Sequence, residues 1–391
     1  MPYFDHNATT PLAPRAREAW LRASEESWQN PSSPYREAAR VRARLEQARE
    51  RLALLLGCPA GHVVFNSGAT EGANAILAYW ARTLPPDGVV AINPTEHPCV
   101  LAAARQAFSP ERLVEIGIDG DGAVKVDALA ALLAAGPAHS AGRVGAVVVM
   151  AANNETGVVQ PWREIGAWCR HHRVAYYCDA AQWLGKVAAG GLGEAGWITA
   201  SAHKFGGPKG AGFLVFPDQA DGFHSQRGGE QEGGRRAGTE DYPAVAAMVA
   251  ALAEAEGVHV LRETERQRHR EAFLAHLRAA LPAARVVGAG AERLWNTVSL
   301  LLPHSENHRW VLKLDRRGFQ VSTGSACATG REGPSHVLAA MKVPPDEARR
   351  VIRISAGWDT AEADWRGLAA ALAATEAELR MAASPDVVTA S

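Results

Sequence analysis

The sequence has few cysteines, no long uncharged apolar run and no signal-peptide pattern at its start. Its five cysteines are irregularly spaced among 391 residues and form no C-x-x-C pair. This argues against a zinc site and against the disulfide framework of a small secreted protein. No run of about 18 uncharged apolar residues is present. We therefore expect a protein of the reducing cytoplasm that does not span a membrane.

An excess of charge of either sign is also missing. The chain has 41 Lys and Arg against 42 Asp and Glu, a formal net charge of -1. A protein whose main partner is nucleic acid or an anionic membrane usually carries a basic excess, so we expect neither as a direct partner. What the sequence does have is apolar content, 47% of its residues, and a length that exceeds one compact domain.

Strand-like and helical patterns alternate as far as about residue 240. A helical pattern at 35–56 precedes a short strand at His62–Phe65, and another helical pattern covers Pro161–His171. The later strand-like runs are Val89–Ile92, Leu113–Ile116, Val144–Met150, Val174–Cys178, Trp197–Ala200 and Gly212–Phe216. Such alternation predicts an α/β fold with a mostly parallel sheet between two layers of helices.

The pattern changes beyond residue 240 and predicts a second, smaller α/β domain. Two long alanine-rich helical patterns, 244–256 and 261–281, are placed to connect the two domains. We predict a large domain of residues 16–257. We predict a small domain of residues 1–15 and 258–391, which carries a loop at about 322–333.

A lysine directly follows one of the predicted strands. Lys204 precedes Phe205 and the segment Gly-Gly-Pro-Lys-Gly at 206–210, which favours an irregular, fixed loop. A lysine that attacks a carbonyl cofactor needs a rigid position and a partly desolvated amine. A solvated lysine beside a turn explains this segment equally well when it is considered alone.

Two more polar segments stand where predicted strands end. Asp179 ends an apolar strand, at the sheet edge where parallel sheets bind ligands, and a carboxylate there can keep a pyridine nitrogen protonated. Ser67–Thr70 turns a strand into a helix, whose first backbone N–H groups can bind a phosphate. Each segment by itself is also typical of an ordinary helix cap.

One cysteine differs from the others in its surroundings. Cys327 stands in Ser-Thr-Gly-Ser-Ala-Cys-Ala-Thr-Gly, residues 322–330, which has little apolar content to bury it. We expect a mobile, exposed loop with a reactive thiol, although chance exposure is the alternative. Protein cysteines are more often buried and inert. That is what we expect of Cys58, Cys99, Cys169 and Cys178.

Together and in this order, the motifs resemble those of the cysteine desulfurases, pyridoxal-phosphate (PLP) enzymes of the class V aminotransferase-like family. The resemblance covers nearly the whole chain. Its landmarks are Asp5–Pro11, Ser67–Glu71, Thr95–His97, Asn153–Gly157, Asp179–Gln182, His203–Lys204, Arg236–Thr239, Gly324–Cys327 and Val351–Ser355. It implies PLP fold type I, with a large PLP-binding domain around a mostly parallel, mixed sheet and a smaller α/β C-terminal domain.

The resemblance also implies a role for each site residue. Lys204 would bind PLP covalently, Asp179 would face the pyridine nitrogen, and His97 would stack on the ring. The other cofactor contacts would come from Asn154 and Gln182 at the ring oxygen and from Ala69, Thr70, Ser201 and His203 at the phosphate. Arg353 would bind the substrate carboxylate together with Asn154, because a planar guanidinium suits that group.

Partners follow from the same resemblance. Thr239 would reach the phosphate in the partner subunit, which implies a homodimer. The segment around Cys327 resembles the family branch with the longer catalytic loop, which is tied to iron–sulfur assembly. We therefore expect a sulfur-acceptor protein, either an iron–sulfur scaffold or a sulfur carrier. We expect no dedicated metal site, only a transient iron–sulfur ligand role for Cys327. Two departures, Gly233 in place of a basic residue and a glycine-rich segment 328–333, lie where an acceptor would be chosen.

The implied reaction converts L-cysteine to L-alanine and leaves a persulfide on Cys327. The Lys204 amine would take the Cα proton. Cys327 would attack the substrate sulfur as a thiolate. Because a free thiol with a pKa of ~8.5 is mostly protonated at pH 7, a base is needed, and His97 is the candidate.

Other functions stay open at this point. A selenocysteine lyase or another class V enzyme, such as an aminotransferase, would share the cofactor site without needing Cys327 in the same way. A non-catalytic scaffold with the same fold is the alternative of another class. It would have no chemical need for Lys204, Asp179, His97 and Arg353 together.

Overall fold

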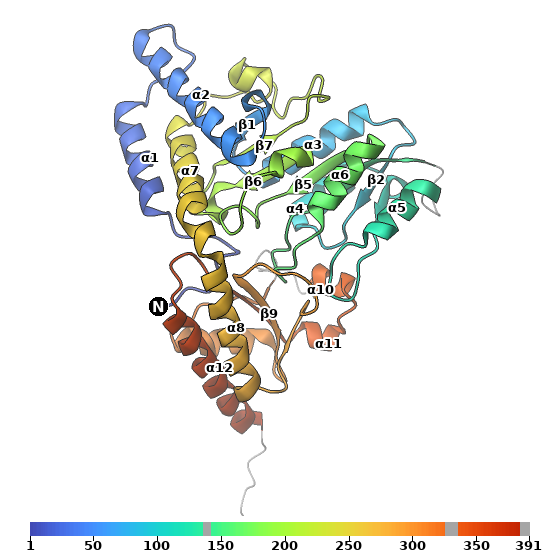
Figure 1. Ribbon diagram of the computed structural model, residues 1–391, viewed down its shortest axis with the longest axis vertical. Helices are drawn as coiled ribbons and strands as arrows, with labels where there is room; N and C mark the ends of the chain where they lie inside the picture. The colour runs from blue at the N-terminus through green and yellow to red at the C-terminus, as the bar shows by residue number, and fades with distance from the viewer. Residues whose placement is uncertain (136–141, 325–334, 384–391) are drawn as a thin grey trace, which may run out of the picture.

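A computed structural model describes residues 1–135, 142–324 and 335–383, and its upper body is built around a seven-stranded sheet (Figure 1). The strand β7 runs antiparallel to both of its neighbours, and the other adjacent pairs are parallel. In their order across the sheet the strands are β1 (Val63–Asn66), β7 (Gly212–Val215), β6 (Trp197–Ser201), β5 (Ala175–Asp179), β4 (Val144–Val148), β2 (Val89–Ile92) and β3 (Leu113–Glu115). The mostly parallel, mixed sheet predicted from the sequence is confirmed.

Helices cover both faces of this sheet. On one face α3 (Ala69–Thr83) and α4 (Pro98–Ala107) pack their apolar sides against β2, β4 and β7. On the other face lie α2 (Arg36–Leu56), α6 (Trp162–His172) and α7 (Tyr242–Glu254). The helix α1 (Pro14–Glu26) packs along α7, and Leu129 of α5 (Val126–Ala135) is buried in the core on the same face of the sheet. The inner strands are mostly apolar because both faces of the sheet are covered, and the polar residues Asn66, Asp179 and Ser201 stand at strand ends.

The lower body has its own sheet and core. The strand β9 (Thr297–Leu301) pairs antiparallel with β10 (Val351–Ser355) and with β8 (Arg285–Val286). The helices of this part are α8 (Glu263–Ala280), α9 (Asn307–Arg316), α10 (His336–Ala340), α11 (Pro345–Ala348) and α12 (Glu362–Ala383). Phe4 is fully buried in this core, so the N-terminus packs with residues far along the chain. In Figure 1, α7 and α8 follow one another from the upper body into the lower.

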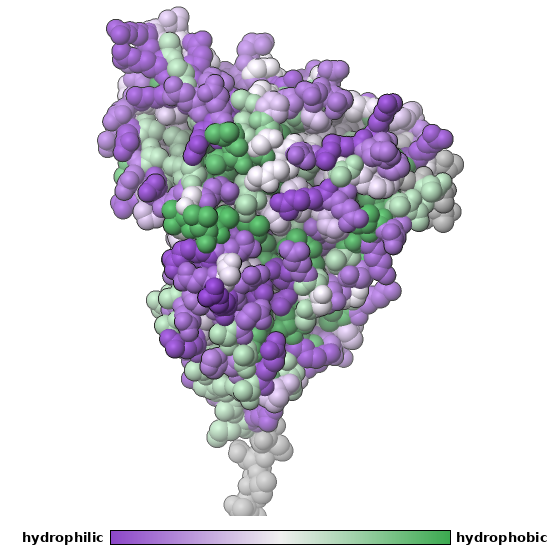
Figure 2. All heavy atoms as spheres, viewed as in Figure 1, coloured by the Kyte–Doolittle hydropathy of each residue, from purple (hydrophilic) through white to green (hydrophobic). Residues whose placement is uncertain are grey.

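One helical stretch of the described residues, 242–280, would be long and apolar enough to cross a membrane. In the structure, however, Ala247, Met248 and Leu252 of this stretch are buried against the large sheet. A core helix passes the same test of length and composition. Figure 2 shows mainly hydrophilic side chains on this face of the molecule, with the apolar ones scattered among them. We therefore interpret 242–280 as core structure.

Candidate active site

Lys204 lies just beyond β6, at the end of a single helical turn, Ala202–Lys204. Its amine donates to the carbonyl oxygens of Asn7 at 2.6 Å and Ala8 at 2.9 Å. The side-chain amide of Gln182 donates to the same Asn7 oxygen at 3.0 Å. The N-terminal segment therefore joins two of the predicted site residues. Asn7 was not predicted as a site residue, although it lies in Asp5–Pro11, one of the segments that carry the family resemblance. No local pattern shows that the chain start reaches this sheet edge.

Asp179 is the last residue of β5, the strand next to β6. Its side chain is buried and accepts the backbone N–H of Ala181 at 2.9 Å. Burial raises the pKa of Asp179 to about 6, against the opposing effects of that hydrogen bond and of Lys204. A cationic group bound against this carboxylate would favour its ionised form. Asp179 and Lys204 thus come together at the edge where β5 and β6 end.

The turn into α3 forms a small cradle with the end of β6. The backbone N–H of Ala69 donates to the Ser201 hydroxyl at 2.9 Å. Gly68 has a φ of +145°, and a Cβ there would lie 3.0 Å from the Ser201 oxygen, so only glycine allows this approach. Thr70 is exposed in the first turn of α3. His203 Nδ1 lies 3.1 Å from the Thr9 hydroxyl. The helix start and these hydroxyl groups suit a phosphate.

His97 is the N-cap residue of α4, and its Nδ1 accepts the backbone N–H of Cys99. Burial, together with smaller effects of the positive charges of Lys204, His336 and Arg353, lowers the pKa of His97 to about 4. At neutral pH the imidazole is therefore uncharged. His97 therefore lies within electrostatic range of Lys204 and Arg353.

Arg353 lies in β10 and is fully buried. One terminal nitrogen contacts Asp5 at 2.6 Å, and the other donates to the carbonyl oxygens of Asn154 and Gly324. Its Nε has no hydrogen-bond partner among the residues that the structure describes. A substrate carboxylate at this position would share the guanidinium with Asp5.

The residues present fit PLP. Two buried amide oxygens, Asn154 Oδ1 and Gln182 Oε1, have no hydrogen-bond partner within the described ranges. They belong to the same site as the Lys204 amine, the buried Asp179 carboxylate and the N-terminus of α3. PLP has the matching groups, namely an aldehyde, a pyridine nitrogen, a ring hydroxyl and a phosphate.

Cys327 lies outside the described residues, but both flanks of its segment reach the site. The Gly324 carbonyl accepts from Arg353 at 3.0 Å, and the Ser335 hydroxyl donates to Glu155 at 2.5 Å. Among the other cysteines, Cys169 and Cys178 are buried as expected. Burial also raises the pKa of Cys58 to about 11, which leaves its thiol protonated and unreactive.

Lys186 is a buried amine that the sequence analysis missed. Its side chain is 5% exposed, and its Nζ has no hydrogen-bond partner among the described residues. Burial lowers the pKa of Lys186 to about 7, with a smaller effect in the same direction from Lys204. A lysine is normally exposed, so sequence gives no signal for this position.

Replacing Lys186 with methionine should change how stability depends on pH. The pKa of this amine falls from 10.5 to about 7 on folding, so between these values the unfolded chain binds more protons. The free energy of unfolding of the parent should therefore rise with pH across this window, from a burial cost on the order of 4 kcal/mol near pH 7 to none above pH 10.5. Lys186→Met should be more stable than the parent near pH 7 and lose this slope.

Denaturant unfolding of the cofactor-free protein at a series of pH values measures this effect. Lys125→Met, at an exposed position, is the matched control and should follow the parent. If the free energy of unfolding depended on pH equally in the parent and in Lys186→Met, folding would not lower the pKa of Lys186.

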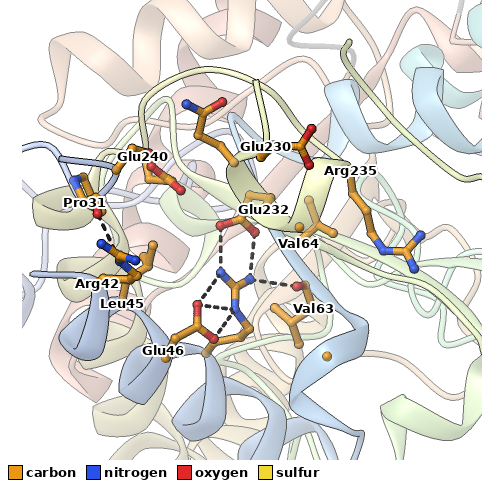
Figure 3. A pocket seen from close by; sticks show the side chains of 15 residues that line it. Pro31, Arg42, Leu45, Glu46, Val63, Val64, Glu230, Glu232, Arg235 and Glu240 are labelled. Atoms are coloured by element: carbon orange, nitrogen blue, oxygen red, sulfur yellow. Dashed lines mark hydrogen bonds and ion pairs between the residues drawn. The ribbon is translucent and has the colours of Figure 1, made fainter. Parts of the chain in front are cut away.

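The segment before Thr239 is anchored by a buried ion pair. Arg49 of α2 contacts both carboxylate oxygens of Glu232 at 2.7 and 2.8 Å, and the backbone N–H of Phe65 donates to Glu232 as well. Figure 3 shows Glu232 and Glu46 approaching the same guanidinium beside a cavity of about 570 Å³. Glu232 and Gly233 both have left-handed backbone angles, with φ of +51° and +64°. This conformation explains a glycine where the sequence analysis expected a basic residue.

Thr239 itself is exposed, and it lines a small pocket together with Ser67 and Gly210. The neighbouring Arg236 forms an ion pair with Glu71 at 3.1 Å. The 230–240 segment therefore lies against the start of α3, where the phosphate cradle is.

Changing Glu232 to glutamine should destabilise the protein strongly. The change removes the buried counter-charge of Arg49 and leaves only the exposed carboxylate of Glu46 beside its guanidinium. Breaking a buried ion pair in this way typically costs about 3–5 kcal/mol. Glu46→Gln is the matched control, because Glu46 contacts the same guanidinium but its side chain is 54% exposed. We expect that control to cost less than about 1 kcal/mol. Denaturant unfolding of both variants measures the difference, and equal effects would contradict a buried pair.

Comparisons with known proteins agree with this geometry. The model of the family "Aminotransferase class-V" matches residues 2–366. The chain is 36% identical to a cysteine desulfurase of Cereibacter sphaeroides, over 92% of each chain. It is 35% identical to a cysteine desulfurase of Klebsiella pneumoniae, over 90% of this chain and 87% of that one. Among solved structures, a NifS-like protein from Rickettsia africae is similar with a TM-score of 0.85 and 26% identity, over 96% of this chain and 99% of that one.

Proposed function

The chain belongs to the class V aminotransferase family, and we propose that it is a cysteine desulfurase that uses PLP to convert L-cysteine to L-alanine. The observation that carries this proposal is the meeting of Lys204 and Asp179 at the ends of neighbouring strands. One supplies an amine and the other a buried carboxylate, which are the two groups that this cofactor requires. Cys327 supplies the sulfur nucleophile in the same chain.

Different residues of the chain have different roles in the reaction. PLP, when bound, supplies a sink for the electron pair that the substrate Cα gains on losing its proton. Asp179 holds the pyridine nitrogen in its protonated form, and Gln182 and Asn154 bind the ring's oxygen side. Ala69, Thr70, Ser201 and His203 hold the phosphate at the start of α3. Arg353 orients the substrate through its carboxylate.

Lys204 then carries out the proton transfer, and Cys327 accepts the sulfur. The Lys204 amine takes the proton from the substrate Cα. The Cys327 thiolate attacks the substrate sulfur, so that a sulfur–sulfur bond forms while the carbon–sulfur bond breaks and its electron pair stays with the substrate carbon. The products are alanine and a persulfide on Cys327, which passes its outer sulfur to an acceptor.

Product analysis tests this function. The PLP-loaded protein is incubated with L-cysteine and a thiol reductant, and alanine and sulfide are both measured. A desulfurase releases the two in equal amounts. A selenocysteine lyase would release selenide from selenocysteine but little sulfide from cysteine. An aminotransferase would need a 2-oxo acid as a second substrate. A non-catalytic scaffold would form no product from either amino acid.

The proposal also includes the protein that receives the sulfur from Cys327. We propose a sulfur-acceptor protein, either an iron–sulfur scaffold or a sulfur carrier, with Cys327 as a transient ligand during delivery. The sequence of residues 322–333 supports this choice. We place the reaction in the reducing cytoplasm, where cysteine thiols such as that of Cys327 stay free of disulfides.

We also propose a homodimer in which Thr239 completes the cofactor site of the partner subunit. Thr239 is exposed, and its segment shares the cavity of Figure 3 with Pro31 and Ser32. Near these residues Trp28 is 70% exposed and Tyr35 is 50% exposed. Large exposed aromatic side chains are typical of a surface that another chain covers.

Sedimentation of the PLP-loaded enzyme should therefore give a dimer, with roughly 2,000 Å² or more buried as in obligate interfaces. Thr239→Val should weaken PLP binding without splitting the dimer, since it removes only a hydroxyl. A stable, active monomer that retains PLP would rule out shared sites.

A further inference from the structure

The ring of His97 is held by the residue two positions along its own helix. Its Nδ1 accepts the backbone N–H of Cys99 at 3.2 Å, and the Sγ of Cys99 lies 3.0 Å from the same nitrogen. A backbone amide can only donate a hydrogen bond. The His97 Nδ1 therefore carries no proton, and in the neutral ring the proton lies on Nε2.

The surroundings of His97 keep the ring neutral. The positive charges of Lys204, His336 and Arg353 each lower the pKa of His97, in addition to the larger effect of burial. The ring also sits at the N-terminus of α4, where the helix dipole disfavours a cation. Of these neighbours, His336 is itself positioned by the Glu96 carbonyl oxygen, 2.8 Å from its Nε2.

The thiol of Cys99 completes this arrangement. Because Nδ1 offers only its lone pair, the Sγ at 3.0 Å must approach it as an S–H donor. A thiolate there would set two lone pairs against each other. Nδ1 thus has two donors from one residue, the backbone N–H and the side-chain S–H. Both stabilise the neutral form of the ring, because an imidazolium would carry a proton on Nδ1.

We propose that Cys99 is a positioning residue, which fixes His97 as a neutral hydrogen-bond donor through Nε2. This inference rests on the proposed placement of His97 over the cofactor. His97 then presents an N–H, and not a lone pair, to the bound substrate. A neutral imidazole at a helix N-terminus that acts as an electrophile is an arrangement known from other enzymes. The thiol proton of Cys327 must accordingly leave to a group other than His97, in contrast to the base role that the sequence suggested.

Nitrogen NMR of the cofactor-free protein tests the proposal without relying on activity. The protein is labelled with [15N]histidine, and a His97→Asn variant assigns the resonance among the 14 histidines. In the parent we expect the Nε2–H tautomer at pH 7. In Cys99→Ala, which keeps the backbone N–H but loses the thiol, we expect the same tautomer and a His97 pKa raised by roughly half to one unit. Cys99→Ser, which retains a donor, should stay near the parent value.

Three results would overturn the inference. They are an Nδ1–H tautomer or an imidazolium in the parent at pH 7, an unchanged His97 pKa in Cys99→Ala, and a Cys99→Ser value as high as that of Cys99→Ala. None of these results bears on whether the loaded enzyme makes alanine and sulfide. Failure of the proposed function would instead appear in the product analysis, with the NMR result intact. Cys58→Ala is the matched cysteine control and should leave the His97 resonance unchanged.

Discussion

Replacing Lys204 with alanine should lower the rate of alanine formation from cysteine by roughly 10²–10⁴-fold, the effect typical of losing a general base, or by more if covalent attachment of PLP is also needed. The amine lies at the end of β6, next to the carboxylate that ends β5. Borohydride reduction of the parent, followed by peptide mapping, should place a pyridoxyl group on Lys204. Lys209→Ala changes an exposed lysine in the same loop and should leave both readouts unchanged.

The nearby amine of Lys186 makes the mapping informative. Its pKa of about 7 leaves it partly uncharged at neutral pH, so it is the amine most able to react in place of Lys204. A pyridoxyl group on Lys186 in Lys204→Ala, with turnover still lost, would agree with our assignment. A pyridoxyl group on another lysine of the parent, or turnover retained in Lys204→Ala, would show the assignment to be wrong.

Cys327→Ser should retain PLP, its colour and cysteine binding, but sulfide release should fall by at least about 10²-fold. A serine hydroxyl is hardly ionised at neutral pH and cannot carry a persulfide, whereas a thiol provides a few per cent of thiolate. Mass spectrometry of the parent after cysteine treatment should find one added sulfur, on Cys327. Cys58→Ala and Cys169→Ala are suitable controls. Cys99 is not, because it contacts His97.

The outcomes of the Cys327→Ser experiment separate the candidate functions. Alanine and sulfide made at the parental rate would exclude Cys327 as the nucleophile, and added sulfur on another cysteine would weaken the assignment. Loss of cysteine activity with selenocysteine cleavage retained would have a narrower meaning. Selenium leaves carbon more readily than sulfur, so Cys327 would then be needed only for the stronger bond.

The sequence alone determined the fold class, the family and the order of the motifs. Periodicity placed helix 35–56 within one residue of α2, Arg36–Leu56, and Val351–Ser355 coincides with β10. Strands and helices with a strong apolar pattern are set by local burial, which the sequence shows directly. The helices α1 and α4 were not predicted, although their apolar residues recur with helical periodicity, so the signal was present in the sequence.

Only the tertiary structure decided which polar groups meet. Asn7 reaches Lys204 across 197 positions of the chain, and Glu232 reaches Arg49 across 183. Such pairs are brought together by strand order and chain crossings, which no local pattern contains. The burial of Lys186 and the tautomer of His97 were likewise decided only by the tertiary structure. Both depend on the burial and the donors around one nitrogen atom, and these exist only once the chain has folded.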